Sequence, residues 1–272
     1  HGFTWEEMKW LVDWCFVRGV NLLYPHAFFY SIRGPRKDER PPDVGPHSPW
    51  WDDYKPFADY VRRMSWLNTD SDHVCHIAIL TESSNLPWAA AKICFQHQRD
   101  FNYLELRHLW ENAEVMPEGI FIAGMHYKAA ILDGLTAIPA AAEPALQTLA
   151  DAGRLIAWQS TPLPSVQSVQ SVEDFLTTID HLIPPDLAAT PPAPDLRYRH
   201  VVKEGAHYYI LVNEGLTPLS TTLTISVNGR ATWIDPLAMT ETTASEPLDL
   251  TLEPYTLRIL RITNYQLPIT NP

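Results

Sequence analysis

The sequence predicts a chain of mixed class, α/β followed by all-β, with the end of a (β/α) barrel, a complete α/β domain and a small antiparallel β-sandwich. Three observations predict this order. Apolar segments of strand length alternate with helical segments as far as residue 183, a proline-rich segment follows, and only strands come after it. We therefore expect domains at 1–70, 71–183 and 197–262, a stiff linker at 184–196 and a tail at 263–272.

The composition limits the classes of partner. The 272 residues are 46% hydrophobic, which suffices for real cores, and the net charge is −12. An acidic chain is a poor match for nucleic acid or an anionic membrane, and no apolar run approaches the roughly 20 residues that span a bilayer. Neither a phosphate-binding glycine loop nor a metal-ligand spacing is present, so we expect no cofactor and no metal. The chain starts at His1 without a Met or a signal peptide, so we expect a piece of a longer protein and infer no localisation.

The sequence of the first domain predicts one fragment of a β/α repeat. Thr4 and Glu7 form a capping box ahead of a helix that runs to about Arg18. The organising element follows: an apolar run over Val20–Tyr24, predicted to be a buried strand, which Pro25 ends. A loop over Ser31–Asp52 and a helix over Asp53–Leu67 complete the fragment. Because one strand cannot bury itself, the rest of a barrel is expected upstream of residue 1.

The second domain alternates strands with helices, which predicts a parallel, doubly wound sheet of flavodoxin-like type. Its expected elements are a strand at Val74–Leu80, a helix from about Pro87, a helical stretch at Tyr103–Glu111, strands at Gly119–Ala123 and Ala129–Leu132, a helix at Ala140–Ala152, a strand at Arg154–Trp158 and a helix at Val172–Leu182.

The third domain contains strands only. They are expected at Arg197–Lys203, His207–Asn213, Thr221–Val227, Thr232–Asp235, Leu248–Leu252 and Thr256–Ile262. Glu204-Gly205 and Asn228-Gly229 are both typical of tight hairpin turns.

Candidate ligand-binding residues gather after the organising strand. They are His26, Tyr30, Trp50 and Trp51, in a polar, proline-rich loop on the side where α/β barrels place their chemistry. Aromatic faces suit the apolar faces of sugar rings, and an imidazole can bond a hydroxyl. The alternative is structural: the tryptophans hold the loop on the barrel and the histidine is buried and satisfied. We expect one indole to pack toward the next helix and the other to lie near His26.

The same loop holds four carboxylates, Glu39, Asp43, Asp52 and Asp53. Glycoside hydrolysis needs two carboxyl groups, one protonated and one ionised, across the scissile bond. Sequence alone cannot place two loop carboxylates at that separation, and charged loops are commonly just solvated. The catalytic residues therefore stay unassigned.

An alternative for the second domain is a glutamine amidotransferase, whose nucleophile sits in a strand-to-helix elbow. The matching position follows Gly119–Ala123, where the chain reads Gly124-Met125-His126 with no Cys or Ser. Cys75 lies in a predicted strand and Cys94 in a predicted helix, so both are expected to be buried and inert, and Cys15 is expected to be a buried free thiol as well. The domain looks catalytically empty.

The order of barrel end, amidotransferase-like domain without a nucleophile and small β domain resembles glycoside hydrolases of the family 42 β-galactosidase and family 106 α-L-rhamnosidase type. The residues most similar to the second are Gly19-Val20-Asn21, His26, Gly45-Pro46-His47-Ser48-Pro49-Trp50-Trp51 and Tyr60-Val61-Arg62-Arg63. This resemblance implies that His26 and Trp50 line a substrate pocket, and that the general acid and its partner lie on earlier barrel strands.

The function predicted on these grounds is that of the C-terminal part of a glycoside hydrolase, α-L-rhamnosidase-like, acting on a carbohydrate substrate. The alternative is a non-catalytic carbohydrate-associated scaffold that forms a homo-oligomer through the second domain.

Overall fold

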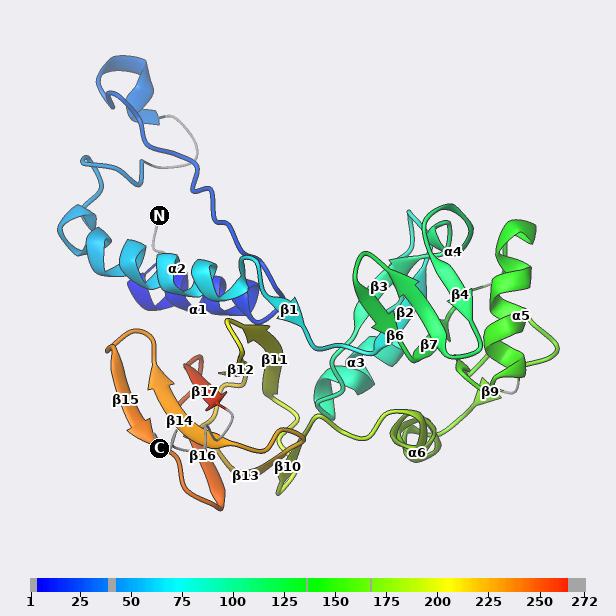
Figure 1. Cartoon of the computed structure of the whole chain (residues 1–272). Helices are drawn as coiled ribbons and strands as arrows, with labels where there is room; N and C mark the ends of the chain where they lie inside the picture. The colour runs from blue at the N-terminus through cyan, green and yellow to red at the C-terminus, as the bar shows by residue number, and fades with distance from the viewer. Residues whose placement is uncertain (1–3, 39–42, 136, 167, 264–272) are drawn as a thin grey trace, which may run out of the picture.

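The computed structural model describes residues 4–38, 43–135, 137–166 and 168–263, which form three units (Figure 1). The first contains α1 (Trp5–Phe16), the short 3-10 turns η1 (Gly34–Asp38) and η2 (Trp51–Asp53), and α2 (Tyr54–Asn68). The predicted capping box is confirmed, because the Thr4 side chain accepts from the Glu7 amide and the Glu7 carboxylate accepts from the Thr4 amide. α1 ends earlier than expected, ahead of a turn that Gly19 closes at φ +90°.

The predicted strand Val20–Tyr24 is wrong. This segment runs as irregular chain, and its Leu22 and Tyr24 side chains are 76% and 91% exposed. A strand needs a neighbour for its amides and carbonyls, and none of the strands that the structure describes pairs with this one. Instead, the Asn68 side chain donates to the Val20 carbonyl at 3.0 Å. The segment has the apolar pattern of a strand, but the described residues supply no neighbouring strand to pair with it.

The middle unit is built on a five-stranded parallel sheet in the order β3-β2-β7-β8-β9. Numbered along the chain this is 2-1-3-4-5, the flavodoxin-like order. The strands are β2 (Ile77–Thr81), β3 (Asn102–Glu105), β7 (Ala129–Asp133), β8 (Leu155–Trp158) and β9 (Ser168–Val169).

Helices cover both faces of this sheet. They are α3 (Ala89–Gln96), α4 (His108–Glu111), η3 (Ala140–Ala142) with α5 (Glu143–Asp151), and α6 (Val172–Leu182). Side chains of β2 alternate between the faces: Ile77 and Ile79 join the core beside α3 and α6, whereas Ala78 and Leu80 join the core beside α5. The doubly wound arrangement follows from this alternation.

Two predictions for the middle unit are corrected. Tyr103–Glu111 is not one helical stretch, because its first part is the edge strand β3 and only His108–Glu111 is helical. Gly119–Ala123 does not belong to the parallel sheet. It forms β5 (Gly119–Ile122) between β4 (Glu114–Met116) and β6 (Met125–Tyr127) in a separate antiparallel sheet. Short apolar segments do not reveal which neighbour they will pair with.

The C-terminal unit contains two antiparallel sheets. One has the order β1-β11-β12-β17-β14-β15 and the other β10-β13-β16. The bounds are β1 (Asp72–His73), β10 (Leu187–Thr190), β11 (Leu196–Lys203), β12 (Ala206–Asn213), β13 (Leu219–Ile225), β14 (Arg230–Asp235), β15 (Thr240–Thr243), β16 (Leu248–Leu252) and β17 (Leu257–Thr263).

Three local predictions change here. The predicted strand Val74–Leu80 starts too early, since only Ile77–Thr81 enters the parallel sheet, and β1, which precedes Val74, pairs with β11. The predicted linker contains β10, which pairs with β13. Asn228-Gly229 connects strands of different sheets and closes no hairpin, whereas the turn at Glu204-Gly205 between β11 and β12 is confirmed, with φ of +51° and +77°.

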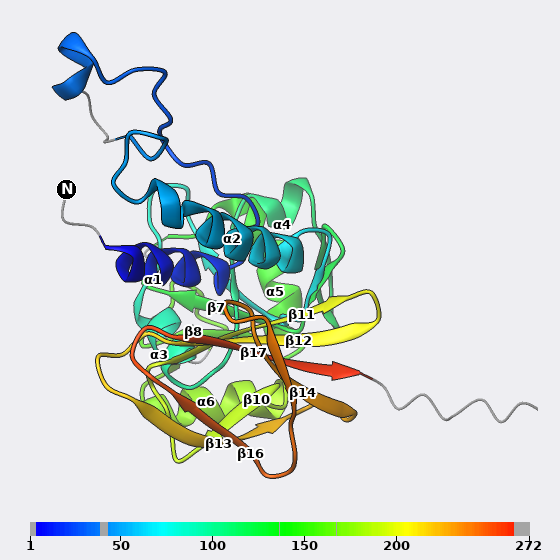
Figure 2. The same ribbon diagram turned by 90° about the vertical axis from the view of Figure 1, so that its left-hand side faces the viewer.

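The six-stranded sheet buries side chains on both faces. Tyr209 and Leu211 face the core shared with the three-stranded sheet. Ile210 and Val212, which alternate with them, face α1 and α2. Figure 2 shows these two helices lying side by side across the sheet. The first unit is therefore held by the C-terminal unit, although the chain between them forms the middle unit. In the described part of the chain no helix has the length and apolarity needed to cross a membrane.

Candidate functional site

The segment after α1 projects away from the rest of the molecule and presents aromatic side chains (Figure 1). Tyr30 is fully exposed, Tyr24 nearly so, and Phe28 is half exposed. Contiguous exposed apolar side chains are typical of a surface that contacts a partner or a ligand. His26, predicted to contact ligand, is exposed in this segment.

One predicted tryptophan is part of an aromatic cluster that ties the loop to α2. The Trp51 indole stacks on Tyr54, with ring centres 5.7 Å apart and an interplanar angle of 16°. Phe28 meets both rings edge-on. The close approach depends on Gly45, because a Cβ there would lie 2.8 Å from the Phe28 ring. Trp51 remains 41% exposed and so keeps an accessible edge.

The Asp43 carboxylate fixes the base of this loop. It accepts hydrogen bonds from the amides of Phe29 at 2.8 Å and His47 at 3.1 Å. Slight burial opposes ionisation, but the backbone donors outweigh it and lower the pKa of Asp43. A general acid needs the reverse, a carboxyl that keeps its proton near neutral pH. Asp43 is thus a structural anchor.

The remaining predicted residues are only partly brought together. Trp50 is half-buried beside Trp51 at the start of η2, while His26 and Tyr30 lie on the projecting segment. Asp52 and Asp53 are exposed where α2 begins, and Glu39 lies outside the described residues. The structure thus joins Phe28, Trp51 and Tyr54, whereas a pocket containing His26 and both indoles is not formed by the described residues alone.

The carboxyl edge of the parallel sheet is where doubly wound proteins bind ligands, at the point where the strand order reverses. Here that point lies between β2 and β7. The Asp133 carboxylate at the end of β7 accepts a hydrogen bond from the Ala90 amide at 2.8 Å, so the chain's own carboxylate occupies the start of α3. No Cys or Ser follows β7, where the chain reads Asp133-Gly134-Leu135.

The cysteines offer no nucleophile either. Cys75 and Cys94 are buried, as predicted, and burial raises the pKa of both thiols well above the usual value. Cys15 differs from the prediction, since it is only partly buried.

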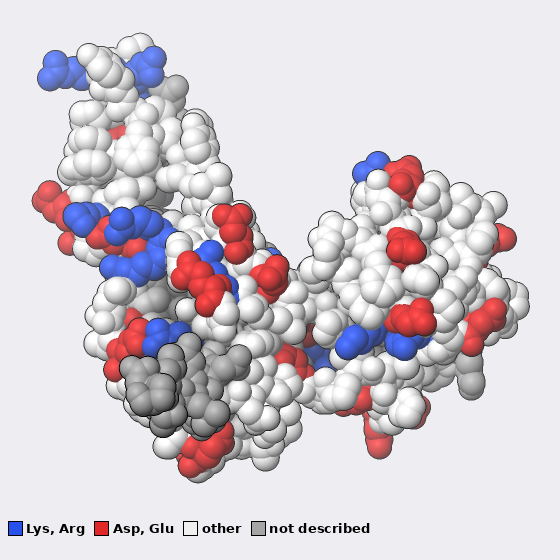
Figure 3. Space-filling model, viewed as in Figure 1, with Lys and Arg blue, Asp and Glu red and all other residues white. Residues whose placement is uncertain are grey.

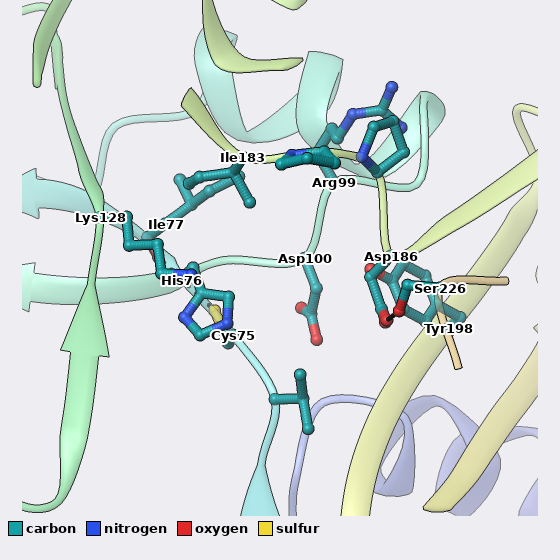
Figure 4. A pocket seen from close by; sticks show the side chains of 13 residues that line it. Cys75, His76, Ile77, Arg99, Asp100, Lys128, Ile183, Asp186, Tyr198 and Ser226 are labelled. Carbon is teal, nitrogen blue, oxygen red and sulfur yellow. Dashed lines mark hydrogen bonds between the residues drawn. The ribbon is translucent and has the colours of Figure 1, made fainter. Parts of the chain in front are cut away.

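A polar cavity of about 210 Å³ lies between the middle and C-terminal units (Figure 4). Sequence reasoning missed it, because its walls come from six segments that are far apart in the chain. In Figure 4 the Asp100 carboxylate projects toward the open space, whereas the Asp186 carboxylate lies against Ser226, whose hydroxyl donates to it at 2.6 Å. Each is paired with a histidine: Asp100 with His73 at 2.6 Å and Asp186 with His200 at 2.9 Å.

The Asp186 carboxylate is not suited to be the general acid of a glycosidase. Burial opposes ionisation of Asp186, but donors on His200, Ser226 and Tyr209 outweigh it and lower its pKa. A carboxylate so fully bonded is held ionised and cannot donate a proton to a leaving group. The cavity is a polar junction between two units. Among the residues that the structure describes, no three His, Cys, Asp or Glu side chains are grouped as a metal ion would require.

The fold is similar to that of glycoside hydrolases. A rhamnosidase from Novosphingobium sp. PP1Y matches over 100% of this chain, with 16% identity and a TM-score of 0.70, and the chain covers 31% of that protein. A β-galactosidase from Bacillus circulans sp. alkalophilus matches over 80% of the chain, with 11% identity and a TM-score of 0.50, and 46% of it is covered. The chain thus spans less than half of either protein, and at these identities the likeness is one of fold. No protein-family model and no curated sequence matches the chain.

Proposed function

We propose that this chain is the C-terminal part of a glycoside hydrolase, α-L-rhamnosidase-like in preference, that cleaves O-glycosidic bonds in an oligosaccharide or polysaccharide. The chain contributes one wall of the sugar pocket and two accessory units. The carboxylate pair that performs hydrolysis lies on barrel strands outside these residues.

The exposed aromatic segment is the observation that carries this proposal. Leu22, Tyr24 and Tyr30 are 76%, 91% and 101% exposed, on a segment whose apolar pattern is that of a buried strand. Figure 3 shows a deep notch in the surface between this segment and the middle unit, and its N-terminal wall is largely uncharged. Such a wall requires a covering partner, and the remainder of a barrel supplies both the partner and the missing neighbouring strands. The likeness in fold to part of a rhamnosidase, which extends over the whole of this chain, supports the same assignment.

Trp51 and His26 have separate roles in this proposal. Trp51 is held rigidly by Tyr54 and Phe28, so its free edge can contact a sugar ring without an ordering cost. His26 lies in the same projecting segment and supplies a hydrogen bond to a hydroxyl once the barrel covers it.

The test is an assay of the complete reading frame that contains this chain, beside residues 1–272 alone, against nitrophenyl α-L-rhamnoside and β-D-galactoside. We expect the complete protein to hydrolyse the rhamnoside faster and the 272-residue chain to hydrolyse neither. Turnover by the short chain would place the catalytic pair among its own carboxylates. A complete protein that is inactive on every glycoside would remove the hydrolase assignment.

The alternative function, a carbohydrate-associated scaffold that oligomerises through the middle unit, has one observation in its favour. Leu86 and Trp88, between β2 and α3, are 64% and 63% exposed. Under this alternative the complete protein sediments as an oligomer, Trp88→Ala dissociates it, and no glycoside is cleaved.

A further inference from the structure

A second pocket, of about 640 Å³, opens at the carboxyl ends of β2 and β3 and lies wholly within the middle unit. Its size is within the range of small-molecule sites. The strands contribute Thr81 and Tyr103–Glu105, α4 contributes His108 and Asn112, and the β5–β6 hairpin with its flanks contributes Ile122, Ala123, Met125 and Tyr127. This edge of an open α/β sheet is where such folds bind ligands, and the neighbouring position at Asp133 is already filled.

The polar groups of this pocket suit hydroxyl groups. The Asn112 amide nitrogen, which can only donate, lies 2.8 Å from His108 Nδ1. His108 Nδ1 therefore accepts, and its Nε2 carries the proton and is a donor. The Arg107 guanidinium donates to one Glu105 oxygen at 2.8 Å, which leaves the other oxygen with capacity to accept. His108 and Glu105 line the same pocket, which therefore offers a donor and an acceptor, the two hydrogen-bonding capacities of a hydroxyl.

The apolar walls are rings whose own polar ends are already bonded. The Tyr103 hydroxyl donates to the Pro87 carbonyl at 2.6 Å, and the Tyr127 hydroxyl accepts from the Asn102 side chain at 3.1 Å. What these residues offer the pocket is therefore mainly ring surface, with the Met125 side chain beside them. Ring surface with a few convergent polar groups is the usual lining of a site for a small polar organic molecule.

The charge of the lining selects against ions. Glu105 is the only acidic or basic side chain of Asp, Glu, Lys or Arg type among the lining residues. Its ion pair with the Arg107 guanidinium offsets the charge of the carboxylate, so the pocket offers little net charge to attract an anion or a cation. A pocket lined in this way favours a neutral ligand.

We propose that this pocket, defined by Tyr103, Glu105, His108, Asn112, Met125 and Tyr127, is a non-catalytic binding site for a neutral sugar. It is separate from the aromatic loop and does not depend on where hydrolysis occurs. Figure 1 places α4 at the upper edge of the middle unit, the direction in which the N-terminal segment also projects. The site can therefore hold a remote part of the carbohydrate that the proposed enzyme cleaves.

The test is a titration of the 272-residue chain, labelled with ¹³C at its methionine methyl groups, with methyl α-L-rhamnoside, methyl β-D-galactoside and galacturonate. The chain has five methionines, and Met125 is the only one that lines this pocket. We expect a neutral glycoside to shift the Met125 signal with a Kd on the order of 1 mM, while Met64 and Met239 stay unchanged and galacturonate has no effect.

Glu105→Gln should weaken binding about tenfold, since it replaces a charged acceptor with a neutral amide that has one oxygen, and His108→Ala about fivefold, since it removes the donor. Glu111→Gln, on an exposed carboxylate of the same helix, is the matched control and should bind normally. The proposal is overturned if neither neutral glycoside moves Met125, if both pocket variants bind as wild type, or if galacturonate binds better than the neutral sugars. Because the readout is binding, it is unaffected if the complete protein proves not to be a hydrolase.

Discussion

At the scale of single residues, neighbours decide which side chains are available to a ligand. Trp50 and Trp51 are adjacent in sequence, yet Trp51 stacks on Tyr54 and keeps a free edge, whereas Trp50 is half-buried at the start of η2. The prediction that one indole packs toward the next helix agrees with Trp51. The prediction that the other lies near His26 stays a prediction. Residue type predicts a ligand-binding loop here, but only geometry separates the two indoles.

We expect Asp43→Asn to loosen the aromatic loop without unfolding the molecule. The amide can accept at one oxygen only, so the hydrogen bond to Phe29 or to His47 is lost. Because the folded-state pKa of Asp43 is lowered, its contribution is present above about pH 4 and is lost as the pH falls through the lowered value. Hydrogen exchange of residues 27–47 should speed up with little change in melting temperature. Unchanged exchange would mean that the ring cluster alone fixes the loop.

The thiols should differ in reactivity according to burial. Cys15 is partly exposed and should be alkylated first, while Cys75 and Cys94 should react only when the protein unfolds. Mass spectrometry after brief iodoacetamide treatment of the native protein measures this order. Labelling of Cys75 or Cys94 at the rate of the denatured chain would contradict the catalytically empty middle unit.

At the scale of elements, local signals were sufficient where the element stabilises itself and failed where it depends on a distant partner. The helix at Val172–Leu182 was predicted with its observed bounds, since Ser171 caps it and its apolar face is periodic. The strand prediction for Val20–Tyr24 was wrong because the described residues contain no neighbouring strand for it. β10 was hidden in a proline-rich segment, because what makes it a strand is β13, far along the chain. The pocket beside α4 was not predicted, because the sequence pattern predicts a helix where the edge strand β3 forms.

The β11–β12 hairpin should make stability depend on pH. Burial and the neighbouring His200 lower the pKa of His207. The unfolded chain therefore binds a proton more readily than the folded chain, so stability should fall as the pH drops below about 6.5 toward the lowered value. His207→Gln should flatten urea-unfolding midpoints between about pH 5 and 7, whereas His181→Gln, at an exposed position on α6, should not. If the unfolding midpoint changed with pH equally in both variants, the pH dependence of stability would not come from His207.

At the scale of the whole molecule, the three units meet at one charged junction. Glu214, after β12, pairs with Arg18 from the α1 turn and with Arg197 of β11 at 2.9 Å. Arg197 also donates to the Phe95 carbonyl of α3 at 2.8 Å. The Glu214 carboxylate and the Arg197 guanidinium together thus link all three units, which their distance in sequence concealed.

Glu214→Gln should therefore cost about 2–3 kcal/mol of unfolding free energy, because two largely buried guanidinium groups lose their countercharge. Glu241→Gln is the matched control: its pair with Arg261 is more exposed and should contribute under about 1 kcal/mol. Urea denaturation measures both. Equal effects would show that the junction is held by packing and not by charge.

The most direct measurement of the central claim is kcat/KM for an α-L-rhamnoside in the complete protein carrying Trp51→Ala or Trp110→Ala. The two indoles are 41% and 42% exposed, and Trp110 lies on α4, away from the aromatic loop. If Trp51 lines the sugar pocket, its removal should lower kcat/KM about 5- to 150-fold, or 1–3 kcal/mol, with a much smaller loss of melting temperature, and Trp110→Ala should leave kcat/KM unchanged. Full activity in Trp51→Ala with a large loss of stability would show that the aromatic loop only holds the fold together.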